Sequence, residues 1–362
     1  MNGSNLQVTS PAPQDVWADV LDSDPNALVT QSARWLQARC QLGGHVDASR
    51  LYETTEGRRL VLPLVRREGL GEGALAIRSS YGEGWGMGGL LGPGGITRED
   101  VATVVGDLLR EPALRTLIRP NPLLAKEWAA ARSSSAHAVP RLAHVLDLAG
   151  GFGHVWSRRF APGARANVRK AERSGVTIER GSSERHVEAY YELFGRSLER
   201  WSRRQHEPEW LTRWRGHRRD PVGKLRTLAR LLGGDFGIWI ARLNDCPIAA
   251  AIVLRGVNAH YTRGVMDEDR AGPTRANYLL HRHAIEDACA AGCRHYHFGE
   301  TGRSPSLAFF KTRFGAEPHA YAEYRFERVP LSAFDRCLRT VAKRLVGFSE
   351  PGQAPVDSLR RD

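Results

Sequence analysis

Cysteine and long apolar segments are both scarce in this chain. Its 362 residues contain only five cysteines, and their scattered positions exclude the disulfide framework of a small secreted protein. No run of about 18 apolar residues occurs, so no transmembrane helix is expected. The N-terminal residues lack the basic and apolar regions of a signal peptide. Together these absences predict a protein of the reducing cytoplasm.

Several signatures of catalytic and cofactor sites are also missing. The chain has no Walker A loop, no HExxH helix and no Gly-x-Ser-x-Gly nucleophile elbow. The segment Gly84-x-Gly86-x-x-Gly89 has the spacing of a dinucleotide-binding fingerprint, but the residues that follow it, up to Gly95, cannot begin the helix which that fingerprint requires. We therefore interpret the glycine-rich residues 81–95 as a mobile loop that closes over a substrate, with Trp85 as one contact.

One cluster of potential metal ligands does not have the residue spacing of a zinc site. Cys289 and Cys293 lie near the end of a predicted helix, and His295 and His297 fall on the strand after it. The Cys-x2-Cys pairs that are typical of zinc sites are absent. We therefore predict no metal site and assign the two cysteines to the packing of the helix.

Positive charge is concentrated in one part of the chain. Of a formal net charge of +12, residues 151–230 carry +10, from 19 basic and 9 acidic side chains. Such a stretch attracts polyanions, which include nucleic acids and nucleotide phosphates. The alternative is a solvated helix face in an arginine-rich protein, because only five of the 52 basic residues are lysine.

The order of the expected elements indicates an α+β fold with two lobes. Gly150 and Gly151 mark a boundary between a first lobe, residues 1–150, and a second lobe, residues 151–330, with 331–362 as a C-terminal helix and tail. In the first lobe we expect helices at 16–21, 30–42, 97–111 and 122–132, and strands within 51–67, 74–80, 114–120 and 141–148. In the second lobe we expect helices at 154–160, 162–175, 182–204, 273–292, 306–314 and 332–347, an antiparallel meander over 235–266, and strands at 176–180, 294–299 and 320–329.

Three segments of the second lobe carry recognisable motifs. A basic helix with the sequence RANVRKAERSGV runs from Arg165 to Val176, and a helix–strand unit runs from Ala288 to Gly299. A Phe-Lys-x-x-Phe-Gly motif follows at residues 310–315. These segments resemble the Fem-type (FemABX-like) acyltransferases, a branch of the GNAT superfamily, and the resemblance extends over almost the whole chain.

The resemblance implies two GNAT-like lobes, each a mixed, mainly antiparallel sheet with flanking helices, and a cleft between them. It also implies the transfer of an aminoacyl group from aminoacyl-tRNA, or of an acyl group from acyl-CoA, to an amine. The acceptor would be a small molecule or a nucleotide-linked amine, and the product an amide. A tRNA is then the expected partner, the acyl donor is a co-substrate, and no cofactor is bound permanently.

Lys311 is the expected catalytic residue. The matching lysine of FemX-like enzymes lies at the reacting centre, and a positioned cation stabilises the oxyanion that forms during acyl transfer. Phe310 and Phe314, one helical turn apart, would hold the lysine in place. The alternative is a snorkelling surface lysine beside core phenylalanines.

A second set of residues is expected to bind substrate. Arg165, Arg169 and Lys170 share one broad helix face that could clamp phosphates. The alternative for this face is a solvated surface with intrahelical ion pairs. The further substrate-binding candidates are Asn167, Tyr261, Phe310, Phe314 and Trp85.

One segment departs from the pattern of acetyl-CoA-dependent GNAT proteins. In the turn after the strand at 258–266, those proteins carry an [RQ]-x-x-G-x-[GA] loop whose backbone N–H groups hold the pyrophosphate of CoA. Residues 269–273 do not fit that spacing, and Pro273 removes one N–H donor. The departure favours aminoacyl-tRNA or another acyl donor. Two alternatives stay open: an acetyl-CoA-dependent N-acetyltransferase of small-molecule biosynthesis, and a non-catalytic RNA- or nucleotide-binding module.

Overall fold

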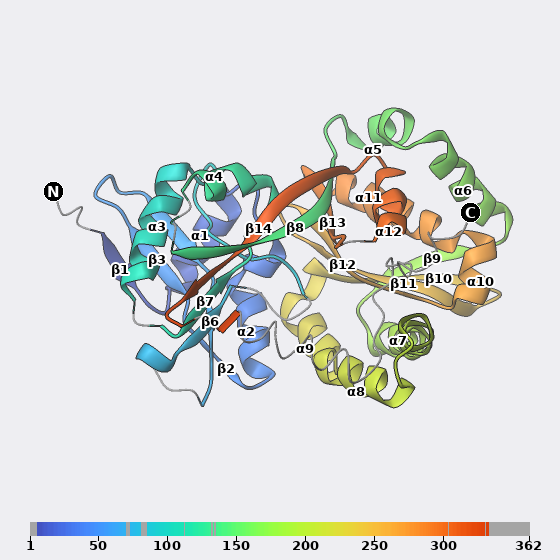
Figure 1. Cartoon of the computed structure of the whole chain (residues 1–362). Coiled ribbons are helices and arrows are strands. Elements are labelled where there is room, and N and C mark those ends of the chain that lie inside the picture. Colours follow the sequence, from blue (N-terminus) through green and yellow to red (C-terminus); the bar gives the residue numbers. More distant parts are fainter. Residues whose placement is uncertain are drawn as a thin grey trace, which may run out of the picture.

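The computed structural model describes residues 6–69, 73–80, 85–111, 113–131, 133, 135–302, 304–329 and 331–332. Figure 1 shows two lobes, which are joined by the long strands β8 (Ala136–Asp147) and β14 (Glu317–Glu327). In both lobes helices flank mixed and mostly antiparallel strands, so the expected α+β class is confirmed. The closing helix expected at 332–347 lies almost wholly outside the described residues.

One sheet runs through both lobes. It has 11 strands in the order β2-β5-β6-β7-β14-β8-β13-β12-β11-β10-β9, and a smaller sheet has the order β1-β3-β4. In the first lobe the strands are β1 (Gln7–Thr9), β2 (His45–Asp47), β3 (Arg50–Glu53), β4 (Arg59–Leu62), β5 (Val65–Arg67), β6 (Ile77–Ser79) and β7 (Arg115–Ile118). In the second lobe they are β9 (Thr177–Gly181), β10 (Phe236–Leu243), β11 (Cys246–Arg255), β12 (Ala259–Met266) and β13 (His295–Glu300).

Helices cover the sheets of both lobes (Figure 1). Those of the first lobe are α1 (Gln14–Ser23), α2 (Ala33–Gln41), α3 (Arg98–Arg110) and α4 (Ala125–Ala130). Those of the second lobe are α5 (Gly151–His154), α6 (Pro162–Arg173), α7 (Glu184–Gln205), α8 (Glu209–Arg219), α9 (Val222–Leu232), α10 (Glu268–Thr274), α11 (Ala276–Ala290) and α12 (Pro305–Thr312). Within the described residues, no helix combines the length and the apolar character that crossing a membrane requires.

Local signals in the sequence account for several element boundaries. Thr97 caps α3 by accepting a hydrogen bond from the backbone N–H of Asp100, whose carboxylate accepts one from the N–H of Thr97 in return. Pro162 is the first residue of α6, where its missing N–H costs nothing. Gly175, just after α6, has a φ of 77°, which favours glycine.

Strand β11 shows how the second lobe builds its core on both faces of the sheet. Successive side chains of a strand point to opposite faces. Ala249 and Ala251 belong to the cluster that contains buried residues of α6 and α11, and Ala250 and Ile252 belong to the cluster that contains α7 and α9. Because β11 is buried on both faces, its sequence is an almost continuous apolar run.

The glycine-rich segment differs from its prediction. Residues 81–84 lie outside the described part of the chain, but most of residues 85–92 are buried, and Trp85 packs among core residues of the second lobe. The hydroxyl of Thr30 donates to the carbonyl of Met87 at 2.6 Å. A Cβ atom on Gly88 would lie 2.0 Å from the carbonyl oxygen of Ser80. The close packing of residues 85–92 does not fit the mobile loop that the sequence suggested, and glycine permits that packing.

Strands β12 and β13 diverge after a short parallel contact. They pair only at Ala259 with Tyr296 and at His260 with His297, and both strands continue beyond these pairs. A gap between diverging strands cannot be closed by backbone hydrogen bonds, so side chains line it. This divergence places a cavity at the centre of the molecule.

Candidate acyl-transfer site

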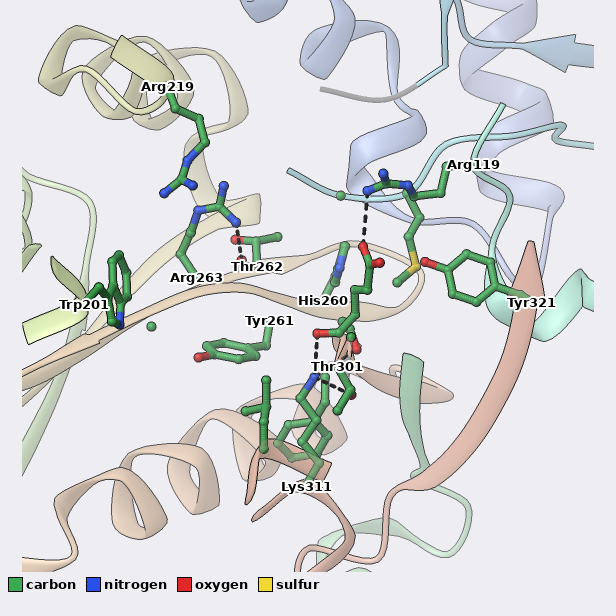
Figure 2. A pocket seen from close by; sticks show the side chains of 18 residues that line it. Arg119, Trp201, Arg219, His260, Tyr261, Thr262, Arg263, Thr301, Lys311 and Tyr321 are labelled. Carbon is green, nitrogen blue, oxygen red and sulfur yellow. Dashed lines mark hydrogen bonds and ion pairs between the residues drawn. The ribbon is translucent and has the colours of Figure 1, made fainter. Parts of the chain in front are cut away.

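The central cavity has a volume of about 470 Å³ and lies beside the diverging strands β12 and β13. Figure 2 shows its side chains, with Trp201 and Arg219 on one side and Arg119 and Tyr321 on the other. The residues that line it are Gly86, Met87, Arg119, Trp201, Arg219, His260, Tyr261, Thr262, Arg263, Gly264, Phe298, Gly299, Glu300, Thr301, Gly302, Leu307, Lys311 and Tyr321. Both lobes therefore contribute to one site.

Three buried polar atoms on the cavity wall have no hydrogen-bond partner among the described residues. They are Nη2 of Arg263, Nδ1 of His260 and the hydroxyl oxygen of Tyr321. Burial lowers the pKa of His260 to about 3, with a further contribution from Lys311 and Arg263, so the imidazole is neutral at pH 7. Because an unpaired buried polar atom costs free energy, these atoms are available for hydrogen bonds to a polar group in the cavity.

Lys311 is buried and forms hydrogen bonds to three consecutive residues of the cavity wall. Its side chain comes from α12, only 1% of the residue is exposed, and its Nζ atom donates three hydrogen bonds of 3.0 Å each. The acceptors are the carbonyls of Gly299 and Glu300 and the hydroxyl of Thr301. Burial lowers the pKa of Lys311 to about 7, and the nearby carboxylate of Glu300 opposes part of that shift.

A buried histidine extends this arrangement. His144 on β8 places its Nδ1 atom 2.7 Å from the hydroxyl of Thr301. Burial, with smaller effects of Lys311 and His319, lowers the pKa of His144 to about 4. At pH 7 the imidazole is therefore neutral, and its Nδ1 can accept the proton of the Thr301 hydroxyl.

Glu323 fixes the position of Arg119 in the cavity wall. This carboxylate on β14 is 1% exposed and lies 2.7 Å from Nη2 of Arg119 and 2.9 Å from Nη2 of Arg141. Burial raises its pKa, but Arg119, Arg141 and Arg325 outweigh burial and lower the pKa to about 2. Glu300 also contacts both arginines, at 3.4 Å from Arg119 and 2.8 Å from Arg141.

A second buried carboxylate organises the opposite side. Asp220 lies 2.8 Å from Nε of Arg219, 2.9 Å from Nζ of Lys224 and 3.4 Å from Nε of Arg263. Burial raises its pKa, but these cations outweigh burial and hold the pKa well below its usual range. The indole N–H of Trp85 also donates to Asp220. Trp85 is thus a buried support beneath Arg263, whose guanidinium lies 4.9 Å from the ring centre.

The structure brings some of the expected site residues together. Lys311 and Tyr261 line the central cavity, and Phe310 lines a second cavity of about 410 Å³ that shares Tyr261 and Leu307 with the first. Phe314 is fully buried below Lys311, against Phe310 at 5.2 Å between ring centres. Whether the two rings hold Lys311 in place or contact a substrate stays a prediction.

The residues expected on α6 lie elsewhere. Arg165, Asn167, Arg169 and Lys170 are not among the residues that line either of these cavities. Arg165 donates to backbone carbonyls at the end of the preceding turn, including that of Trp156 at 3.2 Å. Its charge therefore supports local structure, while Arg169 and Lys170 are exposed. Substrate binding by α6 stays a prediction.

Sequence reasoning missed several wall residues, although β12 carried a signal. Its sequence HYTRG places the polar residues His260, Thr262 and Arg263 in a strand between apolar neighbours. A polar run at that position is unusual for an inner strand and could have been read as a cavity wall. Arg119 and Tyr321 gave no such signal, because only the pairing of β14 with β7 and β8 brings them to the site.

Comparisons with known proteins agree with this geometry. Residues 158–317 match the family described as "Acetyltransferase (GNAT) domain", and no curated protein matches the chain in sequence. The crystal structure of FemX is similar over 94% of this chain and 99% of FemX, with 13% sequence identity and a TM-score of 0.58. The C-terminal domain of a putative lysylphosphatidylglycerol synthetase from Agrobacterium fabrum is similar over 90% of this chain and 95% of that chain, with 12% identity and a TM-score of 0.51. Residues 158–317 thus match the model of a GNAT domain, and the chain as a whole shares its fold with FemX.

Proposed function

We propose that this chain is an N-acyltransferase that forms an amide from an activated acyl group and an amine in the central cavity. The observation that carries the proposal is the cavity beside the diverging strands β12 and β13, both of which belong to the residues that match the GNAT domain. Cations line this cavity, which suits a reaction whose transition state develops negative charge on an oxygen. The unpaired polar atoms on its wall suit a polar acceptor.

The chemistry assigns separate tasks to the wall residues. The amine nitrogen attacks the acyl carbon and an oxyanion forms. Its collapse breaks the bond from the acyl carbon to the leaving oxygen or sulfur, which takes up the proton that the amine loses. Lys311 would stabilise the oxyanion by its charge, which burial strengthens. To donate directly, its ammonium must exchange one of three acceptors for the substrate oxygen. The hydroxyl of Thr301 is the best acceptor to release, because His144 also contacts it.

The segment after β12 favours aminoacyl-tRNA over acyl-CoA as the donor. In place of an open loop, this segment forms α10, whose first turn carries Glu268 and Asp269. Negative charge at a helix N-terminus disfavours the binding of a pyrophosphate there. Pro273 inside the helix also removes one N–H donor.

The description of the matched family favours the second candidate, an acyl-CoA-dependent N-acetyltransferase. The experiment that separates the two incubates the protein with a mixture of amine acceptors and either aminoacyl-tRNA or acetyl-CoA, and detects new amides by mass spectrometry. Lys311→Met serves as the control variant. An amide formed only with aminoacyl-tRNA supports the first candidate, one formed only with acetyl-CoA supports the second, and none with either donor overturns the proposal.

A further inference from the structure

Two exposed tryptophans lie on one face of α8. Trp210 and Trp214 are one turn apart, and 70% and 54% of their surfaces are exposed. The opposite face of α8 packs closely on α7, because a Cβ atom on Gly216 would lie 2.5 Å from a methyl carbon of Leu198. The packing of α8 on α7 therefore explains the residues on the inner face of α8, but it does not explain why two indole rings are exposed on the outer face. Adjacent exposed apolar groups of this size mark binding surfaces.

A hollow of about 570 Å³ lies beside Trp214. Trp214, Arg218 and Arg219 line it from α8, and Trp201 lines it from α7. Trp201 and Arg219 also line the central cavity, so the hollow and the cavity adjoin. In Figure 2 these two residues occupy the side of the cavity opposite Arg119. The hollow thus provides an approach to Lys311 along the surface of the second lobe.

The charges around the hollow favour an anion. Residues 203–219 contain six arginines and two glutamates, and each glutamate is already paired: Glu207 with Arg215 and Glu209 with Arg213. Arg218 pairs with no carboxylate among the described residues, and its guanidinium carbon lies 5.3 Å from the centre of the Trp214 ring. An indole ring beside an unpaired guanidinium presents a stacking surface and a phosphate contact together.

We propose that this hollow binds the single-stranded 3′ end of an RNA. A base stacks on Trp214, Arg218 contacts the adjacent phosphate, and the terminal ribose passes Trp201 and Arg219 into the central cavity. The inference rests on the proposed function, since an acyl group carried on an RNA terminus must reach Lys311. A lipid surface fits less well, because Trp214 lines a hollow beside Arg218 rather than protruding from a wholly apolar face.

The test uses a fluorescent single-stranded RNA that ends in CCA. Its length of about ten nucleotides is within the range that such grooves hold. Binding of this RNA to the full chain is measured by fluorescence anisotropy. Loss of base stacking in Trp214→Ala should weaken binding about 10- to 100-fold, and Trp214→Phe should retain most of it. Arg218→Gln should reduce the dependence of binding on salt by about one phosphate contact. Phe309→Ala is the matched control, because Phe309 is 62% exposed and lies 5.3 Å from the guanidinium of Arg313, away from the hollow.

Four outcomes test whether the hollow binds RNA and separate this inference from the proposed function. Trp214-dependent binding of RNA supports the inference even if no donor yields an amide, in which case only the proposed function fails. Amide formation from aminoacyl-tRNA with an unchanged KM in Trp214→Ala overturns the inference and leaves the proposed function intact. Equal loss of binding in Phe309→Ala overturns it as well. Trp214-dependent binding to phosphatidylglycerol vesicles without binding to RNA would assign the surface to a membrane instead.

Discussion

The hydroxyl of Thr301 lies 3.0 Å from Nζ of Lys311 and is the only side-chain acceptor of that ammonium among the described residues. The same hydroxyl lies 2.7 Å from Nδ1 of the neutral His144. Through one oxygen atom Lys311 of α12 is therefore linked to β8, one of the two strands that join the lobes. This link makes Thr301 a positioning residue for the proposed reaction.

Thr301→Val removes the hydroxyl and keeps the shape of the side chain. The charged form of Lys311 then loses an acceptor, so its pKa falls further. If the ammonium is the active form, the rate declines as pH rises through the pKa of Lys311, and this decline should move to lower pH in Thr301→Val. In Thr301→Ser, which keeps the hydroxyl, the decline should occur at the same pH as in the natural chain. A pH profile of kcat/KM that does not move, beside a lower melting temperature, would assign Thr301 to the fold alone.

Lys311→Ala should lower turnover by about 100-fold or more, the cost of losing one oxyanion donor. Lys311→Arg should rescue little, because a planar guanidinium cannot occupy the space between three acceptors as a compact ammonium does. Turnover is measured together with the melting temperature of each variant. Near-normal turnover in Lys311→Ala would refute a catalytic role.

The buried ammonium of Lys311 should make stability depend on pH in one direction. Its pKa of about 7 in the folded chain is lower than about 10.4 in the unfolded chain, so between these values the unfolded state binds more protons. The free energy of unfolding should therefore rise with pH across this window, as the cost of burying the charge disappears. Lys311→Met removes that contribution.

Denaturant titrations at about pH 6 and pH 9 test this sign, since the two values lie below and within the window. The free energy of unfolding of the natural chain, minus that of Lys311→Met, should be larger at the higher pH. An equal difference at both pH values would show that the pKa of Lys311 is not lowered by burial.

Gly88→Ala should destabilise the chain, while Gly106→Ala should not. A Cβ atom on Gly88 would clash with the backbone carbonyl of Ser80 at 2.0 Å, and a backbone atom cannot move aside cheaply. Gly106 lies inside α3 with no atom within 4 Å of an added Cβ, so alanine should stabilise it by about 0.5–1 kcal/mol. Melting temperatures measure both effects. Equal stability of Gly88→Ala and the natural chain would contradict the close packing of residues 85–92.

The sequence predicted elements whose causes are local. The cap at Thr97, the proline that begins α6 and the apolar run of β11 each depend on neighbouring residues, and the structure has each of them. The meander of β10, β11 and β12 was likewise predictable, because short turns join antiparallel strands.

The remainder depends on contacts that are distant in sequence. Arg119 reaches the cavity because Glu323 holds it, and the two residues lie 204 positions apart. The burial of Trp85 follows from Asp220, which lies 135 positions away. Glycines around Trp85 suggested mobility, whereas Gly88 is required for close approach of two backbones. Composition alone does not distinguish these two uses of glycine.

The pairing of β8 with β14 has a mechanical consequence. Ten residue pairs, from Ala136 with Phe326 to Val145 with Glu317, run without interruption between the lobes. Because both strands extend into both lobes, rotating one lobe away from the other would strain this ladder, and we expect the lobes to move little relative to one another. We therefore expect a substrate to enter the cavity by one end, without a change in the distance between the two lobes. A fragment restricted to residues 158–317 would lack β8 and nearly all of β14, and the exposed flank of β13 should make it prone to aggregation.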